Sequence, residues 1–158
     1  MRASAYIETT VVSYLVAEPT KDLIHAAHQQ VTRDWWATRS RFDLFASAVV
    51  VAEARRGNAA MAARRVEALH GIPNLTAGPR AGALVRSILR SGALPPGARV
   101  DAAHVAIAAI NGVDFLLTWN LRHLANAAIR GKIDEACRRG GFVPPIICTP
   151  EELMEPSP

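Results

Sequence analysis

Cysteine, lysine and long apolar runs are all scarce in this chain. It has only two cysteines, too few for the four ligands of a structural zinc site or for a disulfide framework. No apolar run reaches the roughly 18 residues that a transmembrane helix needs. Glu8 interrupts the N-terminal apolar stretch, so we expect no signal peptide and a cytoplasmic protein with reduced thiols.

Several short functional motifs are absent as well. The sequence has no glycine-rich phosphate-binding loop, no Ser/His/Asp nucleophile signature and no Asp-x-Asp phosphatase motif. Its 18 basic residues, only two of which are lysines, exceed 14 acidic ones and give a net charge of +4. Arginine suits bidentate phosphate contacts, so the charge mildly favours a nucleic-acid partner. A GC-rich genome explains an arginine- and alanine-rich composition equally well.

The length, the composition and the order of strand-like and helix-like segments fit a single α/β domain. A length of 158 residues with 50% hydrophobic residues is enough for one packed core and excludes disorder. Strand-like and helix-like segments alternate, which predicts a mostly parallel sheet. The expected strands are 4–8, 43–47, 73–76, 114–118 and 146–148. The expected helices are 9–16, 21–39, 48–56, 59–70, 80–90, 100–111 and 121–139, with a possible break of the last near Gly131, and a short helix after Thr149.

Four acidic residues have apolar neighbours: Glu8, Glu53, Asp101 and Asp114. In open α/β sheets the ligand site lies outside the carboxyl ends of the strands. Asp114 opens its strand at the amino end and fails this criterion, whereas Asn120, just past the carboxyl end of the same strand, meets it. The pattern therefore predicts that Glu8, Glu53, Asp101 and Asn120 converge.

Three carboxylates in one pocket repel one another and need a cation. Oxygen ligands suit Mg²⁺ or Mn²⁺, and such a site activates water for hydrolysis. Each residue also has a purely structural interpretation. Asp101 fits a helix N-cap, Glu53 fits an ion pair with Arg56, and Glu8 has the weakest structural alternative.

The chain resembles the PIN-domain ribonucleases, most closely the VapC-type toxins of toxin–antitoxin modules. The similarity rests on residues 6–15, 52–53, 101–109 and 116–120 and covers roughly residues 5–125. It implies a three-layer α/β/α fold around a parallel sheet and metal-dependent hydrolysis of RNA. The segment 126–158 would add the last helix, the last strand and a short terminal helix to a single domain spanning 1–158.

The resemblance also implies site residues and partners. Glu8, Glu53 and Asp101 would bind Mg²⁺ or Mn²⁺, and Asn120 would orient metal or water. The partners would be RNA, an antitoxin protein and a second copy of the chain. Two positions differ from the family's usual pattern. The family usually has Asp where this chain has Glu8, and it often has Asp where this chain has Asn120.

Candidate substrate contacts are Thr10, His104, Thr118 and Trp119. The two threonines are placed to bind a phosphate oxygen or a metal-bound water, with a local backbone hydrogen bond as the alternative. His104 is placed to contact the scissile phosphate, although we favour a buried histidine with satisfied hydrogen bonds. Trp119 would either stack a flipped base or pack at the sheet edge.

Two function classes therefore stand. The first is a metal-dependent endoribonuclease, the toxin of a toxin–antitoxin pair. The second is a catalytically weakened PIN-fold domain that binds RNA or a protein without cleavage, which the two departures at Glu8 and Asn120 favour. A phosphatase of small phosphoesters is a weaker third hypothesis.

Overall fold

Five parallel strands form the centre of the molecule. The computed structural model describes residues 1–154, and in it the strands run in the order β3-β2-β1-β4-β5. Their bounds are β1 Ala3–Ile7, β2 Phe42–Ser47, β3 Asn74–Leu75, β4 Phe115–Leu117 and β5 Ile146–Cys148. The predicted α/β class with a parallel sheet is confirmed.

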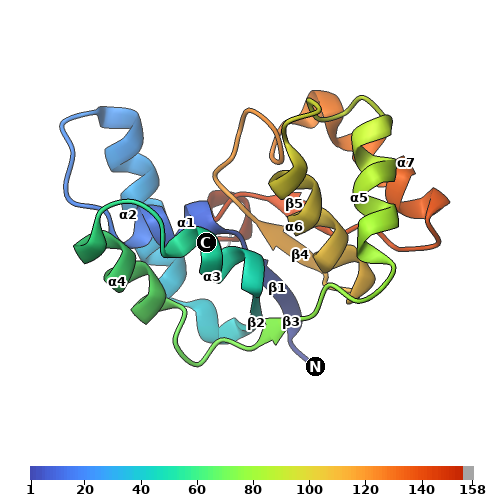
Figure 1. The fold of residues 1–158 in the computed structure, drawn as a ribbon. Coiled ribbons are helices and arrows are strands. Elements are labelled where there is room, and N and C mark those ends of the chain that lie inside the picture. The colour runs from blue at the N-terminus through green and yellow to red at the C-terminus, as the bar shows by residue number, and fades with distance from the viewer. Residues whose placement is uncertain (155–158) are drawn as a thin grey trace.

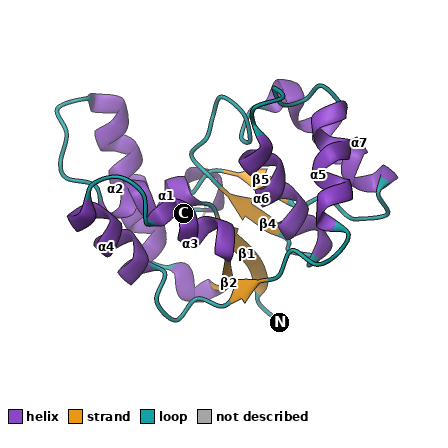
Figure 2. Cartoon of the chain, in the orientation of Figure 1, coloured by secondary structure: helices purple, strands orange, loops and turns teal. Residues whose placement is uncertain are grey.

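Helices cover both faces of this sheet, giving a three-layer α/β/α fold (Figures 1 and 2). One set lies to the left of the strands in Figure 1 and the other to the right. The left set is α1 Thr9–Val16, α2 Leu23–Ala37, α3 Ala48–Ala54 and α4 Ala59–Ala68. The right set is α5 Ala81–Arg90, α6 Arg99–Ile110 and α7 Ala127–Arg139. The three-residue 3₁₀ helices η1 Arg39–Arg41 and η2 Glu151–Leu153 complete the described elements.

The strand order places a reversal point between β1 and β4. From β1 the chain moves outward through β2 to β3, then returns to the other side of β1 as β4 and continues to β5. Tyr6 pairs with Phe45 on β2 and with Leu116 on β4. Parallel sheets bind ligands in the crevice at such a reversal, outside the carboxyl ends of the strands. Glu8 follows β1 and Thr118 follows β4, so both lie at this point.

The core sits on both faces of the sheet and includes most of α6. Seven of the twelve residues of α6 are buried, which confirms the prediction of a buried helix from its all-round apolar sequence. Trp35 is fully buried and Trp36 packs at the edge of the core. Both cysteines, Cys137 and Cys148, are buried free thiols, as expected.

Two predicted helix starts are wrong. α2 begins at Leu23 with Asp22 as its N-cap, because the Thr20 hydroxyl instead accepts the Asp22 N–H and forms a turn. The helix expected from residue 121 begins only at Ala127, capped by Asn126, and then continues through Gly131 without a break. A glycine inside a helix costs about 1 kcal/mol, and burial of the α7 face that carries Ile133 and Cys137 outweighs this cost.

The C-terminal segment forms the expected cap but a tighter helix. The Thr149 N–H donates to the Glu152 carboxylate, and the Glu152 N–H donates back to the Thr149 hydroxyl. This is a capping box, and the helix it opens is the 3₁₀ turn η2. Residues 155–158 lie outside the described part of the chain. Within the described part, every helix is too short or too polar to cross a bilayer.

Candidate metal centre

Glu8 lies at the junction between β1 and α1. It follows β1 directly and acts as the N-cap of α1, where its side chain accepts the N–H of Thr10 at 3.1 Å. The residue is only 4% exposed. A carboxylate buried this deeply needs hydrogen bonds or a cation, and the surrounding hydroxyls supply the first of these.

Two threonine hydroxyls hold one oxygen of Glu8. Oε2 accepts hydrogen bonds from Oγ1 of Thr10 and from Oγ1 of Thr118, the latter at 2.8 Å. The backbone N–H of Trp119 in turn donates to Thr10 Oγ1 at 2.8 Å, and that of Asn120 donates to Thr118 Oγ1 at 3.0 Å. Thr10 and Thr118 therefore fix Glu8 and join the start of α1 to the end of β4. The alternative of a local backbone hydrogen bond is present for Thr118, while binding of a phosphate oxygen or a metal-bound water by either hydroxyl stays a prediction.

Glu53 reaches the same place from α3. Its Oε1 accepts hydrogen bonds from Thr9 Oγ1 and His104 Nε2, both at 2.7 Å. Burial by itself raises the pKa of Glu53, but the bonds from His104 and Thr9 outweigh it, and the net effect is a pKa below the ordinary value. Glu53 is therefore ionised at neutral pH. The alternative ion pair with Arg56 is not formed within 4 Å, and Arg56 only helps to lower this pKa from a distance.

A buried chain of hydrogen bonds orients His104. Its Nδ1 lies 2.8 Å from the Tyr6 hydroxyl, which lies 2.7 Å from the Ser47 hydroxyl. Burial raises the pKa of Tyr6 far above its ordinary value, so this hydroxyl keeps its proton. Because the Glu53 carboxylate only accepts, the hydrogen-bond pattern assigns a proton to Nε2 of His104. The donors then run in one direction from Ser47 through Tyr6 and His104 to Glu53.

The histidine is thus a satisfied buried residue, the interpretation that the sequence favoured. Its side chain is fully buried, and both ring nitrogens are engaged. Contact between His104 and a phosphate, the other interpretation, would require one of these two hydrogen bonds to break.

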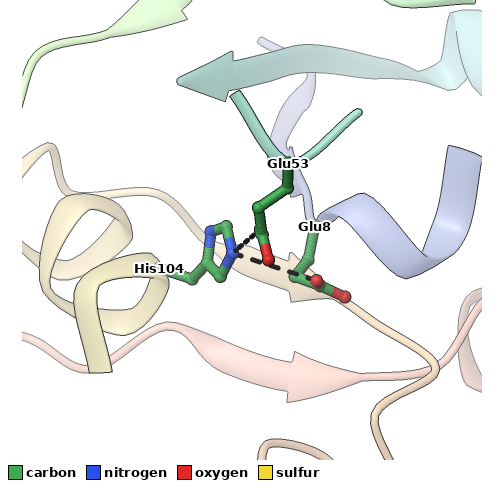
Figure 3. Close-up of side chains that lie close together, drawn as sticks. All are labelled: Glu8, Glu53 and His104. Atoms are coloured by element: carbon green, nitrogen blue, oxygen red, sulfur yellow. Dashed lines mark hydrogen bonds and ion pairs between the residues drawn. The ribbon is translucent and has the colours of Figure 1, made fainter. Parts of the chain in front are cut away.

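Each of the two glutamates keeps one oxygen without a hydrogen bond from the described residues. These are Oε1 of Glu8 and Oε2 of Glu53. Ligand atoms of Glu8, Glu53 and His104 all lie within 4.8 Å of one another, and Figure 3 shows the three side chains meeting from separate elements. His104 Nε2 is 3.9 Å from Glu8 Oε1. Metal-binding carboxylates are commonly hydrogen-bonded at one oxygen and free at the other, so the two glutamates fit a divalent cation.

Asp101 lies beside this group and not within it. Its Oδ2 is 2.7 Å from Nδ1 of His123, and its Oδ1 accepts a 3.3 Å hydrogen bond from the Asn120 amide. The predicted partnership of Asp101 with Asn120 is present, but the structure does not bring the Asp101 carboxylate into the 4.8 Å cluster. Asp101 is also not the N-cap of α6, because Ala98 holds that position and Asp101 lies in the first turn.

The indole ring of Trp119 is packed against neighbouring side chains, and its faces are not accessible to a nucleobase. It is 6% exposed, its indole N–H donates to Thr32 Oγ1 at 2.7 Å, and His28 stacks on its ring at 4.1 Å. Packing at the sheet edge is the interpretation that fits. Its backbone still serves the site, since its N–H fixes the Thr10 hydroxyl.

Four further residues shape the site and are not among those predicted from the sequence. Thr9, Tyr6 and Ser47 hold Glu53 and His104, and His123 holds Asp101. Ser47 and Tyr6 carry no sequence signal, because only the pairing of β1 with β2 brings them together. The spacing of three residues between Asn120 and His123 is a signal that was available, since an Asn side chain often accepts an N–H a few residues on.

The chain matches no family model, no curated protein and no solved structure in the comparisons made. The arrangement itself supports a definite chemistry. Two carboxylates meet at the reversal point of a parallel sheet, each held by hydrogen bonds at one oxygen and with the other oxygen free, which is an arrangement that suits a cation between them. A third carboxylate and an imidazole stand beside them, where a proton acceptor or donor is useful in hydrolysis.

Proposed function

We propose that this protein is a divalent-metal-dependent endoribonuclease. The observation that carries the proposal is the pair of free oxygens, Glu8 Oε1 and Glu53 Oε2, in a cluster whose other oxygens are saturated by hydrogen bonds. Mg²⁺ and Mn²⁺ prefer carboxylate oxygens, and two carboxylates plus water and substrate phosphate are a usual donor set for Mg²⁺.

Different residues of the chain would bind the cation, orient its ligands and accept a proton. Glu8 and Glu53 would hold the cation, with Thr10 and Thr118 fixing the first and His104 and Thr9 the second. When bound, the cation lowers the pKa of water and stabilises charge on a phosphoryl oxygen. Asp101, 19% exposed and tied to His123 and Asn120, adds negative charge at the rim and a route for a proton leaving the site.

RNA as the substrate is supported by the net charge of +4 and by the family resemblance of residues 6–15 and 101–109. The same resemblance supports a cytoplasmic toxin with an antitoxin partner and a homodimeric assembly. The homodimer and the antitoxin partner belong to the proposal and are tested separately. Analytical ultracentrifugation measures whether the protein is a dimer. Co-purification with the product of an adjacent gene tests for an antitoxin.

Cleavage of a mixed RNA pool, transfer RNA included, tests the proposal. Wild-type protein is assayed with Mn²⁺, with Mg²⁺ and with chelator, beside Glu53→Gln and Asp101→Asn proteins purified identically. We expect metal-dependent fragments from the wild type and a loss of at least 100-fold in the variants, on the scale set by removing a group from a catalytic metal site. Equal cleavage by all three proteins would indicate a contaminating ribonuclease and contradict the proposal.

The second candidate is a PIN-fold domain that binds RNA without cutting it. One observation favours it: both oxygens of Asp101 are occupied by His123 and Asn120, so only two carboxylates offer free oxygens. Tight RNA binding by the wild type with neither cleavage nor stabilisation by metal would select this function.

A further inference from the structure

A second pocket opens between α1 and α2, outside the metal centre. It measures about 440 Å³, within the range of small-ligand sites. The residues that line it are Ser13, Tyr14, Ala17, Thr20, His25 and Gln29. None of these is Asp, Glu, Lys or Arg. The lining therefore suits a neutral polar group and not a phosphate or a metal ion.

Aromatic rings form one wall of this pocket. His25 stacks on Tyr14 with ring centroids 5.9 Å apart and planes 14° from parallel. Asp22 fixes the His25 ring through a contact of 3.0 Å to Nδ1, and Nε2 has no hydrogen bond from the described residues. Tyr14 and His25 are both partly or fully exposed. A planar ligand thus meets a preformed stacking surface with a free ring nitrogen beside it.

Gln29 supplies a buried polar group with unused capacity. The residue is 6% exposed and lines the pocket. Its Nε2 donates to the carbonyl of Glu18 at 3.0 Å, which fixes the amide, while its Oε1 accepts no hydrogen bond from the described residues. This oxygen is not among the fully buried atoms that lack a partner, so it is still reachable and can accept an N–H from a ligand in the pocket.

Helix α1 links the pocket to the metal centre, because Tyr14 lines the pocket and Thr10 contacts Glu8. Tyr14 lies four residues after Thr10 on the same face of α1, about 6 Å along the helix axis, and Thr10 holds Glu8. The ring of Tyr14 is also 5.9 Å from that of Trp119, which immediately precedes Asn120. A single strand that follows this side of α1 from the glutamates would reach Tyr14.

We propose that this pocket binds one nucleobase of the single-stranded RNA substrate, next to the phosphate held at the metal centre. The base stacks against the Tyr14–His25 pair and donates an N–H to Gln29 Oε1. Stacking on aromatic side chains and hydrogen bonding to base edges are how proteins read single-stranded RNA. This inference rests on the proposed function, because it takes RNA as the substrate.

Binding in chelator tests the pocket separately from catalysis. The probe is a labelled single-stranded RNA of about 12 nucleotides, beside an abasic ribose-phosphate strand of the same length. We expect His25→Ala and Tyr14→Leu each to weaken binding of the RNA by about 5- to 100-fold and to leave binding of the abasic strand unchanged. Gln29→Met is expected to weaken only strands whose bases offer an N–H donor to its amide.

Matched controls separate the ring contact from other effects. His70→Ala removes an exposed histidine far from α1 and is expected to bind as the wild type does. The conservative variant Tyr14→Phe keeps the ring and is expected to retain most of the affinity. The slope of affinity against salt should be the same for wild type and His25→Ala, since no phosphate contact is lost. Thermal melting of each variant verifies that it is folded.

Any of four outcomes would overturn the pocket proposal. The first three are equal losses on the RNA and the abasic strand, unchanged RNA affinity in His25→Ala and Tyr14→Leu, and a shift in oligomeric state in place of RNA affinity, which would make this face a protein interface. Tighter binding of a free nucleoside monophosphate than of the strand would likewise reject RNA as the occupant. If RNA is bound through the pocket but never cleaved with metal, the nuclease proposal fails and the pocket stands. If RNA is cleaved with metal and the pocket variants change neither binding nor cleavage, the pocket proposal fails and the nuclease proposal stands.

Discussion

His104 Nε2 lies 2.7 Å from Glu53 Oε1, and the opposite ring nitrogen of this histidine lies 2.8 Å from the Tyr6 hydroxyl. The histidine therefore connects a core tyrosine of β1 with a carboxylate at the candidate metal centre. It holds Oε1 of Glu53 and so orients this carboxylate, whose other oxygen is the proposed metal ligand. His104 is a positioning residue in this sense.

Replacing His104 with Leu tests that role. We expect the metal affinity to fall by about 10- to 100-fold, because the Glu53 carboxylate loses the bond that orients it. The free energy of unfolding should fall by about 1–3 kcal/mol, since buried partners are left unsatisfied. Titration calorimetry with Mn²⁺ and urea unfolding measure the two effects. Tyr6→Phe keeps the histidine–glutamate bond and should weaken metal binding much less. Equal metal affinities in wild type and His104→Leu would contradict the positioning role.

The two glutamates should dominate metal binding. Metal at 100 times its dissociation constant stabilises the folded state by about 2.7 kcal/mol, which raises the melting temperature by several degrees in a chain of this size. We expect Glu8→Gln and Glu53→Gln to abolish this shift in Tm. Asp101→Asn should retain more of it while still losing cleavage, because both Asp101 oxygens are engaged elsewhere. Loss of the shift in Asp101→Asn alone would identify Asp101 as the principal ligand.

Much of the site follows from one rule applied to the sequence. This rule, that side chains at the carboxyl ends of parallel strands converge, selected Glu8, Glu53, Asp101 and Asn120 and rejected Asp114. The structure brings Glu8 and Glu53 together and leaves Asp101, with Asn120, beside them. Asp114 lies before β4 at the opposite edge, where its Oδ2 accepts bonds from the backbone and side chain of Ser4. The alternation of strands and helices was likewise enough for the fold class.

Other features depend on contacts that no local pattern encodes. His123 holds the Asp101 carboxylate in place. This histidine lies in a turn that was expected to be the start of the last helix. Asn120 accounts for that turn, because its side chain accepts the His123 N–H and its carbonyl accepts the Ala125 N–H. Asn side chains compete with helical hydrogen bonds in this way. Likewise, the Tyr6–His104 bond joins residues 98 positions apart and follows only from the packing of α6 on β1.

Both thiols should be unreactive in the folded protein. Burial raises the pKa of Cys137 to about 11 and that of Cys148 to about 12, so almost no thiolate forms at neutral pH. We expect a thiol reagent to label neither cysteine in the native protein and both in urea. Mass spectrometry of the labelled chain counts the modified sites. Labelling of the native protein at the rate of a free thiol would contradict the burial of these residues.

Asp114 should contribute to stability in a predictable pH range. Hydrogen bonds from the Ser4 N–H and hydroxyl lower its pKa below the ordinary value of 3.8. A carboxyl with a lowered folded-state pKa contributes stability above the unfolded-state value, and loses this contribution as the pH falls through the folded-state pKa. Unfolding free energies of wild type and Asp114→Asn should therefore differ at neutral pH and converge in acid. If the difference in unfolding free energy between the two proteins stays constant across this pH range, the hydrogen bonds from Ser4 do not depend on the charge of Asp114.

His123 provides the sharpest test of the rim of the site. Its Nδ1 holds the Asp101 carboxylate at 2.7 Å, and its side chain is 29% exposed. Removing it in His123→Ala frees Asp101 but leaves Asn120 in contact with the carboxylate. We expect cleavage to fall by about 10- to 100-fold, as when a supporting residue of a metal site is removed. Metal affinity, reported by the shift in Tm, should change little, because Glu8 and Glu53 keep all their hydrogen bonds. His70→Ala is the matched control. A loss of metal affinity as large as the loss of cleavage would show that Asp101 and His123 belong to the metal-binding set itself.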